Sequence, residues 1–326
     1  MPPLATYTLR RLAQTIPVIE LIMLGNFILL KAIPGDLVDV IAGEGGAASP
    51  EYMDMLRAQF GLDRPDWAQF LAYVRQLGHF DLGYSFRHNM PISQLILDRL
   101  PATLLLIGAA VALAVGLGLL LGALAARFRG GLVDQAVSVF AAVVFATPVF
   151  WIGLMAIVLF AVQLRWFPLG GMTQIGGPPG VLGAVGDIAY HLVLPASTLS
   201  LAYLALYARV TRAAMGEVYD LDYVRTARAK GISEARIAIR HVLRNALLPV
   251  VTLSGLQLGS VLGGAVVVET VFSWPGMGRL AFEAVSDRDI NLLLSLFLCN
   301  SLLVIVMSLV IDLLYGVLDP RVELAS

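Results

Sequence analysis

Apolar side chains gather along this chain into six long runs, which polar segments separate. The hydrocarbon core of a bilayer is about 30 Å thick, so a helix needs roughly 20 mostly apolar residues to cross it. The runs cover residues 12–33, 100–126, 136–162, 191–215, 247–268 and 290–317. Segments with the alternating polarity of a transmembrane β-barrel are absent from the sequence. The pattern predicts an all-α polytopic membrane protein with six transmembrane helices.

Composition favours the same class of protein. Hydrophobic residues make up 58% of the 326 residues, charged residues only 14%, and the mean hydropathy is +0.82. A soluble domain carries roughly 25% charged residues because its surface faces water. The composition therefore excludes a soluble enzyme and a disordered protein. Cys299 is the only cysteine, so no disulfide can form within the chain. A net charge of −1 offers no broad basic face for nucleic acid.

Basic residues are concentrated on one side of the predicted spans. Arg10 and Arg11 precede the first run, Arg127 and Arg129 follow the second, and eight more basic residues lie at positions 209–244. Residues 34–99, on the other side, carry five arginines and nine acidic residues. Short basic loops are retained in the cytoplasm. We therefore expect both termini to be cytoplasmic and residues 34–99 to form an external loop domain.

This topology divides the chain into four predicted parts. Residues 1–33 form an N-terminal segment with the first span, which is too long for a signal-peptide core and precedes no A-x-A-like cleavage site. Residues 34–99 form the external loop, in which Ser49-Pro50 and Asp63-Arg64-Pro65 each favour the start of a short helix. Residues 100–318 form a five-helix core, and residues 319–326 form a cytoplasmic tail.

Several kinds of chemistry are missing from the sequence. The only lysines, Lys31 and Lys230, follow Leu and Ala, so no Gly-Lys-Ser/Thr P-loop exists and the chain does not bind ATP by that motif. The four histidines form no H-E-x-x-H pair, so we expect no metal site. Ion-coupled carriers place ionisable residues in the membrane, where the candidates are Glu20, Glu269 and Asp312. For Glu20, contact with a partner helix or cavity water and a role in ion coupling both remain open.

Residues 216–247, here called the arginine segment, have strong helical character. Gly231 fits the position after a helix end, where a left-handed conformation is needed, and Ser233 is expected to cap the next helix. Arg236, Arg240 and Arg244 recur every four residues and so share one helix face, while Ile239, Leu243 and Ala246 are expected on another. The pattern predicts a helix, a sharp turn and an amphipathic helix. Such a hairpin can lie on anionic lipid or dock a cytoplasmic partner.

Residues 272–278, here called the Trp-Pro-Gly elbow, interrupt the apolar pattern after the fifth run. The Pro-Gly pair breaks the helix and favours a turn. Irregular backbone at membrane depth is tolerated only where protein or a water-filled cavity shields it. We therefore expect this segment to line or cap the external mouth of a pathway; an ordinary surface turn is the alternative.

The arginine segment resembles the EAA loop of ABC-importer permeases, specifically those of the dipeptide/oligopeptide/nickel family. The resemblance rests on Asp222-Tyr223-Val224-Arg225-Thr226-Ala227-Arg228-Ala229-Lys230-Gly231 with Leu248-Pro249, where Arg225-Thr226-Ala227 replaces Glu-Ala-Ala. Further matching motifs are Ile33-Pro34-Gly35-Asp36, Phe60-Gly61-Leu62-Asp63-Arg64-Pro65, Asp81-Leu82-Gly83-Tyr84-Ser85, Arg99-Leu100-Pro101-Ala102-Thr103, Thr270–Gly278 and Asp319-Pro320-Arg321. The chain departs from the family at Ile290-Asn291 and Ser308.

The resemblance implies an ABC type I importer permease fold and a role as half of a transmembrane pore. It implies four kinds of partner: a homologous second permease, two cytoplasmic ATPase subunits, an extracytoplasmic solute-binding protein and the lipid bilayer. ATP and Mg would belong to the ATPase chains, with no cofactor in this one. Peptides, glutathione, nickel chelates, opines and oligosaccharides are substrates of relatives. A standalone channel or carrier without an ATPase is the alternative.

The resemblance also implies a set of site residues. The ATPase-coupling loop would comprise Asp222, Tyr223, Arg225, Thr226, Ala227, Arg228, Lys230, Gly231 and Ser233. The helix break at the Trp-Pro-Gly elbow supplies the candidates for the external gate: Phe272, Trp274, Pro275, Gly276, Met277 and Gly278. Glycines at positions 118 and 122, and at 255, 259 and 263, recur at helical spacing and allow close approach of helices, either within this chain or across the pore.

Overall fold

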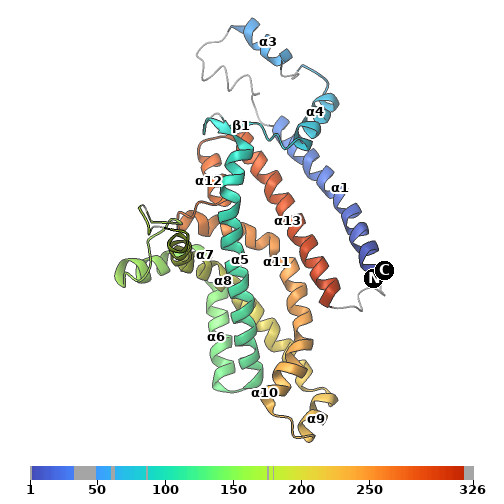
Figure 1. The fold of residues 1–326 in the computed structure, drawn as a ribbon, viewed down its shortest axis with the longest axis vertical. Helices are drawn as coiled ribbons and strands as arrows, with labels where there is room; N and C mark the ends of the chain where they lie inside the picture. Colours follow the sequence, from blue (N-terminus) through green and yellow to red (C-terminus); the bar gives the residue numbers. More distant parts are fainter. Residues whose placement is uncertain are drawn as a thin grey trace. The chain divides into compact units, whose positions relative to one another are not determined.

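The computed structural model describes residues 2–32, 49–59, 63–85, 87–174, 176–178 and 180–318 (Figure 1). Its chain divides into two compact units, one made of Met1–Asp98 with Glu283–Ile305 and the other of Arg99–Phe282 with Val306–Ser326. The motifs at residues 33–36, 60–62 and 319–321 lie outside the described residues.

Almost all regular structure in the described residues is helical, which confirms the all-α class. The only strands there are two residues long and form an antiparallel hairpin. In chain order the elements are α1 (Pro2–Ala32), α3 (Pro50–Gln59), α4 (Asp66–Gly78), β1 (Tyr84–Ser85), β2 (Met90–Pro91), α5 (Ile92–Arg127), α6 (Leu132–Ala146), α7 (Val149–Ala156), η1 (Ile157–Gln163), α8 (Val181–Tyr219), α9 (Asp222–Ala229), α10 (Glu234–Arg236), η2 (Ile237–Leu243), α11 (Arg244–Val271), α12 (Met277–Ser286) and α13 (Ile290–Leu318).

Helices suited to cross a membrane follow the apolar runs, with two differences in form. In the described part of the chain, four segments are long and apolar enough: Ala13–Ala32, Ile92–Arg127, Val181–Tyr219 and Ile290–Val310. The fifth run lies in α11, whose shorter apolar stretch is Gly259–Val271. The third run is not one straight helix, because α6 and the segment Val149–Gln163 meet at 103°.

The bend in the third run has a local cause at Thr147 and Pro148. Thr147 adopts an extended conformation, with φ −98° and ψ 129°. The residue before a proline is disfavoured in the helical region because the proline ring clashes with it, so a helix usually ends there. Pro148 stands directly before α7 with φ −60°, where its missing N–H leaves no helical hydrogen bond unmade. Hydrophobicity alone could not show this break.

In the first unit, α1 packs against α4 through one polar residue and a group of aromatic rings. The side-chain amide of Asn26 donates to the hydroxyl of Tyr73 (3.0 Å) and to the carbonyl of Leu294 (3.1 Å). The rings of Phe27 and Phe70 lie edge to face with centroids 5.4 Å apart. Because Asn26 is buried, these hydrogen bonds offset the cost of placing an amide in an apolar helix.

The short helices predicted between the first two spans are present. In α3 the backbone amide of Tyr52 donates to the hydroxyl of Ser49 (3.3 Å), as expected of a capping serine. Pro65 directly precedes α4. The β-hairpin that follows is held by Ser85, whose buried hydroxyl donates to the carboxylate of Asp289.

The second unit is organised around α8, which packs against α6, α7 and α11. Its core includes Leu106 of α5, Leu199 of α8 and Val268 of α11, all fully buried. Gly118 and Gly122 of α5 lie against α8, where an added Cβ would approach Tyr207 and Thr211 to 2.5 Å. These two glycines therefore serve packing within this chain.

Candidate functional site

The arginine segment forms a compact turn at the end of α8, made of α9, α10 and η2 (Figure 1). Helix α9 buries Val224 and Ala227 and exposes its other side chains. The two buried residues join a cluster with Met215 of α8, Ile237 of η2 and Ala126 of α5, among others. One face of a two-turn helix is therefore fixed to the transmembrane core, and the opposite face is free in the described structure.

Gly231 reverses the chain after α9, as predicted. Its φ is +74°, in the left-handed region that glycine adopts without strain. The amide of Gly231 donates to the carbonyl of Arg228 (2.9 Å), and the amide of Ile232 donates to that of Ala227 (3.2 Å). This pair of bonds is a Schellman motif, which satisfies carbonyls that the helix leaves unpaired. Ile232 and Ala227 also pack in the same apolar cluster, so the turn has a single well-defined geometry.

The predicted hydroxyl cap by Ser233 is wrong. Ser233 occupies the residue before α10, but its side chain makes no capping hydrogen bond. Glu234 instead turns back to Arg228, whose Nε donates to its carboxylate at 2.7 Å. The hydrogen bond from Arg228 lowers the pKa of the Glu234 carboxyl below its usual value. The two sides of the turn are thus joined by an ion pair.

The predicted face of Ile239, Leu243 and Ala246 is also wrong in part. Residues Ile237–Leu243 form a π-helix, in which hydrogen bonds join residues five apart rather than four. The buried positions are accordingly Ile237 and Val242, five residues apart, while Ile239 is 69% exposed. The arginines at positions 236, 240 and 244 remain exposed. An ideal helical wheel misassigned Ile239 because it assumed 3.6 residues per turn throughout.

Tyr223 ties α9 to the start of α11. Its hydroxyl donates to the carbonyl of His241 (3.1 Å) and accepts from the side-chain amide of Asn245 (2.7 Å). Asp222 accepts from Arg225 at 3.5 Å, an exposed contact that holds both side chains only loosely. The exposed face of the turn presents Asp222, Arg225, Thr226 and Lys230.

The Trp-Pro-Gly elbow is built around the carboxylate of Glu269. This carboxylate is fully buried and accepts from the hydroxyl of Thr103 (2.7 Å) and from the amide of Arg279 in the first turn of α12 (3.0 Å). Thr103 in turn accepts from the amide of Met277 (2.8 Å). A carboxylate at a helix N-terminus is stabilised by the free amides and the helix dipole. Glu269 therefore connects α11, α5 and α12.

The elbow residues themselves are packed inside the second unit. Phe272, Trp274 and Met277 are each at most 1% exposed, and the indole N–H of Trp274 donates to the carbonyl of Ala102 (2.9 Å). Pro275 is half-buried. A Cβ at Gly276 would lie 2.2 Å from the Glu269 carboxyl group, and one at Gly278 would lie 2.6 Å from Val266. Their assignment to an external gate stays a prediction.

The structure adds Thr103 and Glu269 to the residues that shape this elbow. The sequence marked Glu269 only as an acidic residue near the end of a span. The glycines at positions 276 and 278 could have indicated that a buried side chain packs there, because glycine allows other groups to approach the backbone closely. Of the other acidic candidates, Glu20 is exposed, and the side chain of Asp312 is not among those described. Among the described residues no cluster of His, Cys, Asp or Glu is suited to a metal ion.

Comparison with known proteins assigns the family. A model described as the inner membrane component of binding-protein-dependent transport systems matches residues 118–324, and the corresponding N-terminal model matches residues 4–107. The chain belongs to this permease family. Like its other members, it is a multi-pass inner-membrane component of a binding-protein-dependent ABC importer.

Curated relatives place this permease within the dipeptide family. It is 41% identical over 332 residues to the di/tripeptide transport system permease protein DppB of Pseudomonas aeruginosa, with 98% of each chain covered. It is 39% identical to the dipeptide transport system permease protein DppB of Escherichia coli, over 97% of this chain and 98% of that protein. A putative peptide transport system permease protein of Brucella suis is 40% identical, with the same two coverages.

A solved structure supports the fold. The inward-facing MetNI methionine ABC transporter matches 69% of this permease and 97% of the solved chain, with a TM-score of 0.55. At 16% sequence identity this match shows shared architecture alone. The prediction of an ABC importer permease fold is confirmed.

Proposed function

We propose that this permease forms half of the translocation pore of an ATP-driven peptide importer. The relatives are named as di/tripeptide, dipeptide and putative peptide permeases and match nearly the full length, which supports peptides as the substrate class. A homologous second permease supplies the other half. Gly259 and Gly263 of α11 support this pairing, because both are exposed and nothing lies within 4 Å of an added Cβ. Such a surface allows another helix to approach closely.

The arginine segment couples ATP hydrolysis on separate ATPase subunits to the transmembrane helices. The observation that supports this role is a short exposed helix whose opposite face is anchored in the core. Helix α9 is fixed by its Schellman turn at Gly231 and by the apolar cluster around Val224. A displacement of its exposed face by a docked subunit is therefore passed to α8 and α11 rather than absorbed by a loose loop. Arg225 and Lys230 offer cations for that contact, while Arg228 is engaged by Glu234.

The orientation follows from the same role. Both termini and the arginine segment face the cytoplasm, where ATP and Mg bind the ATPase chains, and residues 34–99 face the solute-binding protein outside. The basic residues of the segment agree with the retention of basic loops in the cytoplasm. The elbow at residues 272–278 follows the opposite end of α11, and we expect it to line or cap the external mouth of the pathway.

Two substitutions at Gly231 test the coupling role. Nothing lies within 4 Å of a Cβ built there, so an added Cβ meets no neighbour and the positive φ is the main constraint on the residue. Valine resists this conformation, at a cost of about 1 kcal/mol or more, whereas asparagine visits it more readily. We expect Gly231→Val to abolish peptide uptake in proteoliposomes that contain the partner permease, ATPases and binding protein. Gly231→Asn should keep most of the uptake.

Membrane abundance and ATP hydrolysis distinguish loss of coupling from loss of folding. The Val variant should insert at wild-type levels and either lose ATPase association or hydrolyse ATP without uptake. Uptake and substrate-stimulated hydrolysis at wild-type levels in this variant would contradict the coupling role and leave the hairpin as a lipid-surface element. Transport by this chain without any ATPase would instead support the alternative, a standalone channel or carrier.

A further inference from the structure

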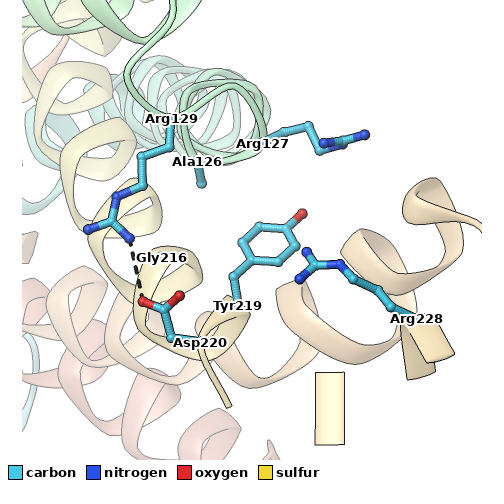
Figure 2. A pocket seen from close by; sticks show the side chains of 7 residues that line it. All are labelled: Ala126, Arg127, Arg129, Gly216, Tyr219, Asp220 and Arg228. Atoms are coloured by element: carbon cyan, nitrogen blue, oxygen red, sulfur yellow. Dashed lines mark ion pairs between the residues drawn. The ribbon is translucent and has the colours of Figure 1, made fainter. Parts of the chain in front are cut away.

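Three arginines face one hollow of about 180 Å³ beside the arginine segment (Figure 2). Arg127 ends α5, Arg129 lies in the turn that follows, and Arg228 belongs to α9. Tyr219 and Asp220, at the end of α8, also line the hollow. All these residues belong to the same compact unit. Three arginines thus line a space whose lining includes a single carboxylate, that of Asp220.

The three arginines are unequally neutralised. Arg129 lies 3.5 Å from Asp220, but both side chains are about two-thirds exposed or more, so the pair is weak and exchangeable. Arg228 directs one edge of its guanidinium to Glu234, which leaves other N–H groups available. Among the described residues no carboxylate lies within ion-pairing distance of Arg127, whose guanidinium sits 5.6 Å from the ring of Phe128. The hollow therefore keeps a surplus of positive charge.

Tyr219 supplies a second, independent signal of a ligand. Its hydroxyl is buried and has no hydrogen-bond partner among the described residues. Figure 2 shows the hydroxyl on the side of the ring that faces the guanidinium groups of Arg127 and Arg228. The Arg228 guanidinium lies 5.7 Å from the ring centroid. A buried donor without an acceptor is unfavourable, so the site calls for an acceptor such as an anionic oxygen.

The position of the hollow favours a lipid. The helices α5 and α8 are both candidate spans, and they end at Arg127 and Tyr219. The hollow therefore lies at the end of two candidate spans, on the side where the basic residues gather. Phe128, between Arg127 and Arg129 in the sequence, is 50% exposed, which suits contact with acyl chains. Basic pockets between helices on the cytoplasmic side of a membrane bind anionic headgroups.

We propose that this hollow binds the phosphate of an anionic phospholipid. Arg127 and Arg228 would donate to its oxygens in the bidentate geometry that guanidinium groups favour, and the Tyr219 hydroxyl would complete the site. Arg129 would exchange Asp220 for the phosphate or add to the field. Tyr219, Asp220 and Arg228 belong to the arginine segment, but lipid binding requires only that the chain lie in a membrane, so this proposal does not rest on the coupling role.

Native mass spectrometry of the purified full chain in detergent can test this site. The probes are phosphatidylglycerol, phosphatidylcholine and inorganic phosphate, each titrated separately. The variants are Arg127→Gln and Tyr219→Phe, and the matched control is Arg240→Gln, which removes an exposed charge from η2 outside the hollow. We expect one phosphatidylglycerol bound more tightly than phosphatidylcholine. Its affinity should fall about fivefold in Arg127→Gln and about threefold in Tyr219→Phe, and stay unchanged in Arg240→Gln.

Three outcomes would overturn the proposal. Equal losses in Arg127→Gln and Arg240→Gln would show a diffuse surface charge rather than a site. Inorganic phosphate that binds as tightly as phosphatidylglycerol would identify a free anion as the ligand. Phosphatidylglycerol binding that is unchanged in Arg127→Gln would show that the hollow does not hold the lipid phosphate. A thermal unfolding curve for each variant verifies that it is folded.

Discussion

Two helix ends in this permease use the same turn with different residues. After α9 the left-handed position is Gly231, with φ +74°, and after α11 it is Ser273, with φ 51°. Both turns show the paired bonds of a Schellman motif, the second through the amide of Ser273 to Thr270 (3.3 Å) and that of Trp274 to Glu269 (2.8 Å). Glycine adopts this conformation freely, whereas serine is strained in it.

The residue that follows each turn explains why the strained conformation of Ser273 persists. Ile232 follows Gly231 and is half-buried at the edge of its cluster, whereas Trp274 follows Ser273 and is fully buried. The conformation of the elbow is thus fixed by the buried side chain of Trp274 and by Glu269. The conformation of the turn in the arginine segment depends on the backbone freedom of Gly231. Strained residues persist only where their surroundings over-determine them.

The largest expected effect tests the anchoring of the elbow. Trp274→Ala removes a fully buried indole and its hydrogen bond to Ala102, so the free energy of unfolding should fall by about 3–5 kcal/mol. Ile232→Ala, at the equivalent place in the other turn, should cost only about 1 kcal/mol because the side chain is half-buried. Denaturant titration of the purified variants measures both. Equal losses would contradict the difference between the two turns.

Gly276 in the elbow is required because there is no room for a side chain, not because of its backbone conformation. Gly276→Ala would place a methyl group against the buried Glu269 carboxylate, 2.2 Å away, and should destabilise the permease by about 1–3 kcal/mol. Gly259→Ala is the matched control in α11, where nothing lies within 4 Å and alanine favours the helix. The purified control should therefore unfold at the wild-type denaturant concentration or above it. A neutral Gly276→Ala would show that Glu269 can move aside.

Exchanging the two turn residues should give effects of opposite sign. Ser273→Gly relieves strain and should stabilise the permease, while Gly231→Ser introduces strain and should destabilise it, each by about 1 kcal/mol. Ser273 is exposed, so the first change loses little packing. Thermal unfolding of the two single variants and the double variant measures the exchange. Two changes of the same sign would refute the comparison.

The smallest expected effect concerns the ion pair across the Gly231 turn. Arg228 lowers the pKa of Glu234, so the pair stabilises the folded state above the ordinary glutamate pKa of about 4.3 and is lost as pH falls through the lower folded pKa. Both side chains are about one-third exposed or more, so Glu234→Gln should cost less than about 1 kcal/mol at pH 7. Stability measured from pH 7 to pH 3 should converge for the variant and the wild type.

The sequence predicted most of the helices because each is marked by composition over many residues. It also predicted the Gly231 turn, since a lone glycine between two helical patterns has a local cause. It missed the π-helix at Ile237–Leu243 and the bend at Thr147, which are departures of a few residues within continuous apolar or amphipathic patterns. It could not connect Thr103 with Glu269, because the two lie 166 positions apart and only folding brings them together.

The bend between α6 and α7 affects the surrounding membrane as well as the protein. Helix α6 has 15 residues and is therefore about 22 Å long at the rise of an α-helix. A bilayer core measures about 30 Å, so α6 is too short to cross it alone. Lipids beside this helix must compress, or the oblique α7 must complete the crossing, and mismatch costs a fraction of a kcal/mol per Å. The acyl-chain length of the surrounding lipids therefore affects this permease at α6 in particular.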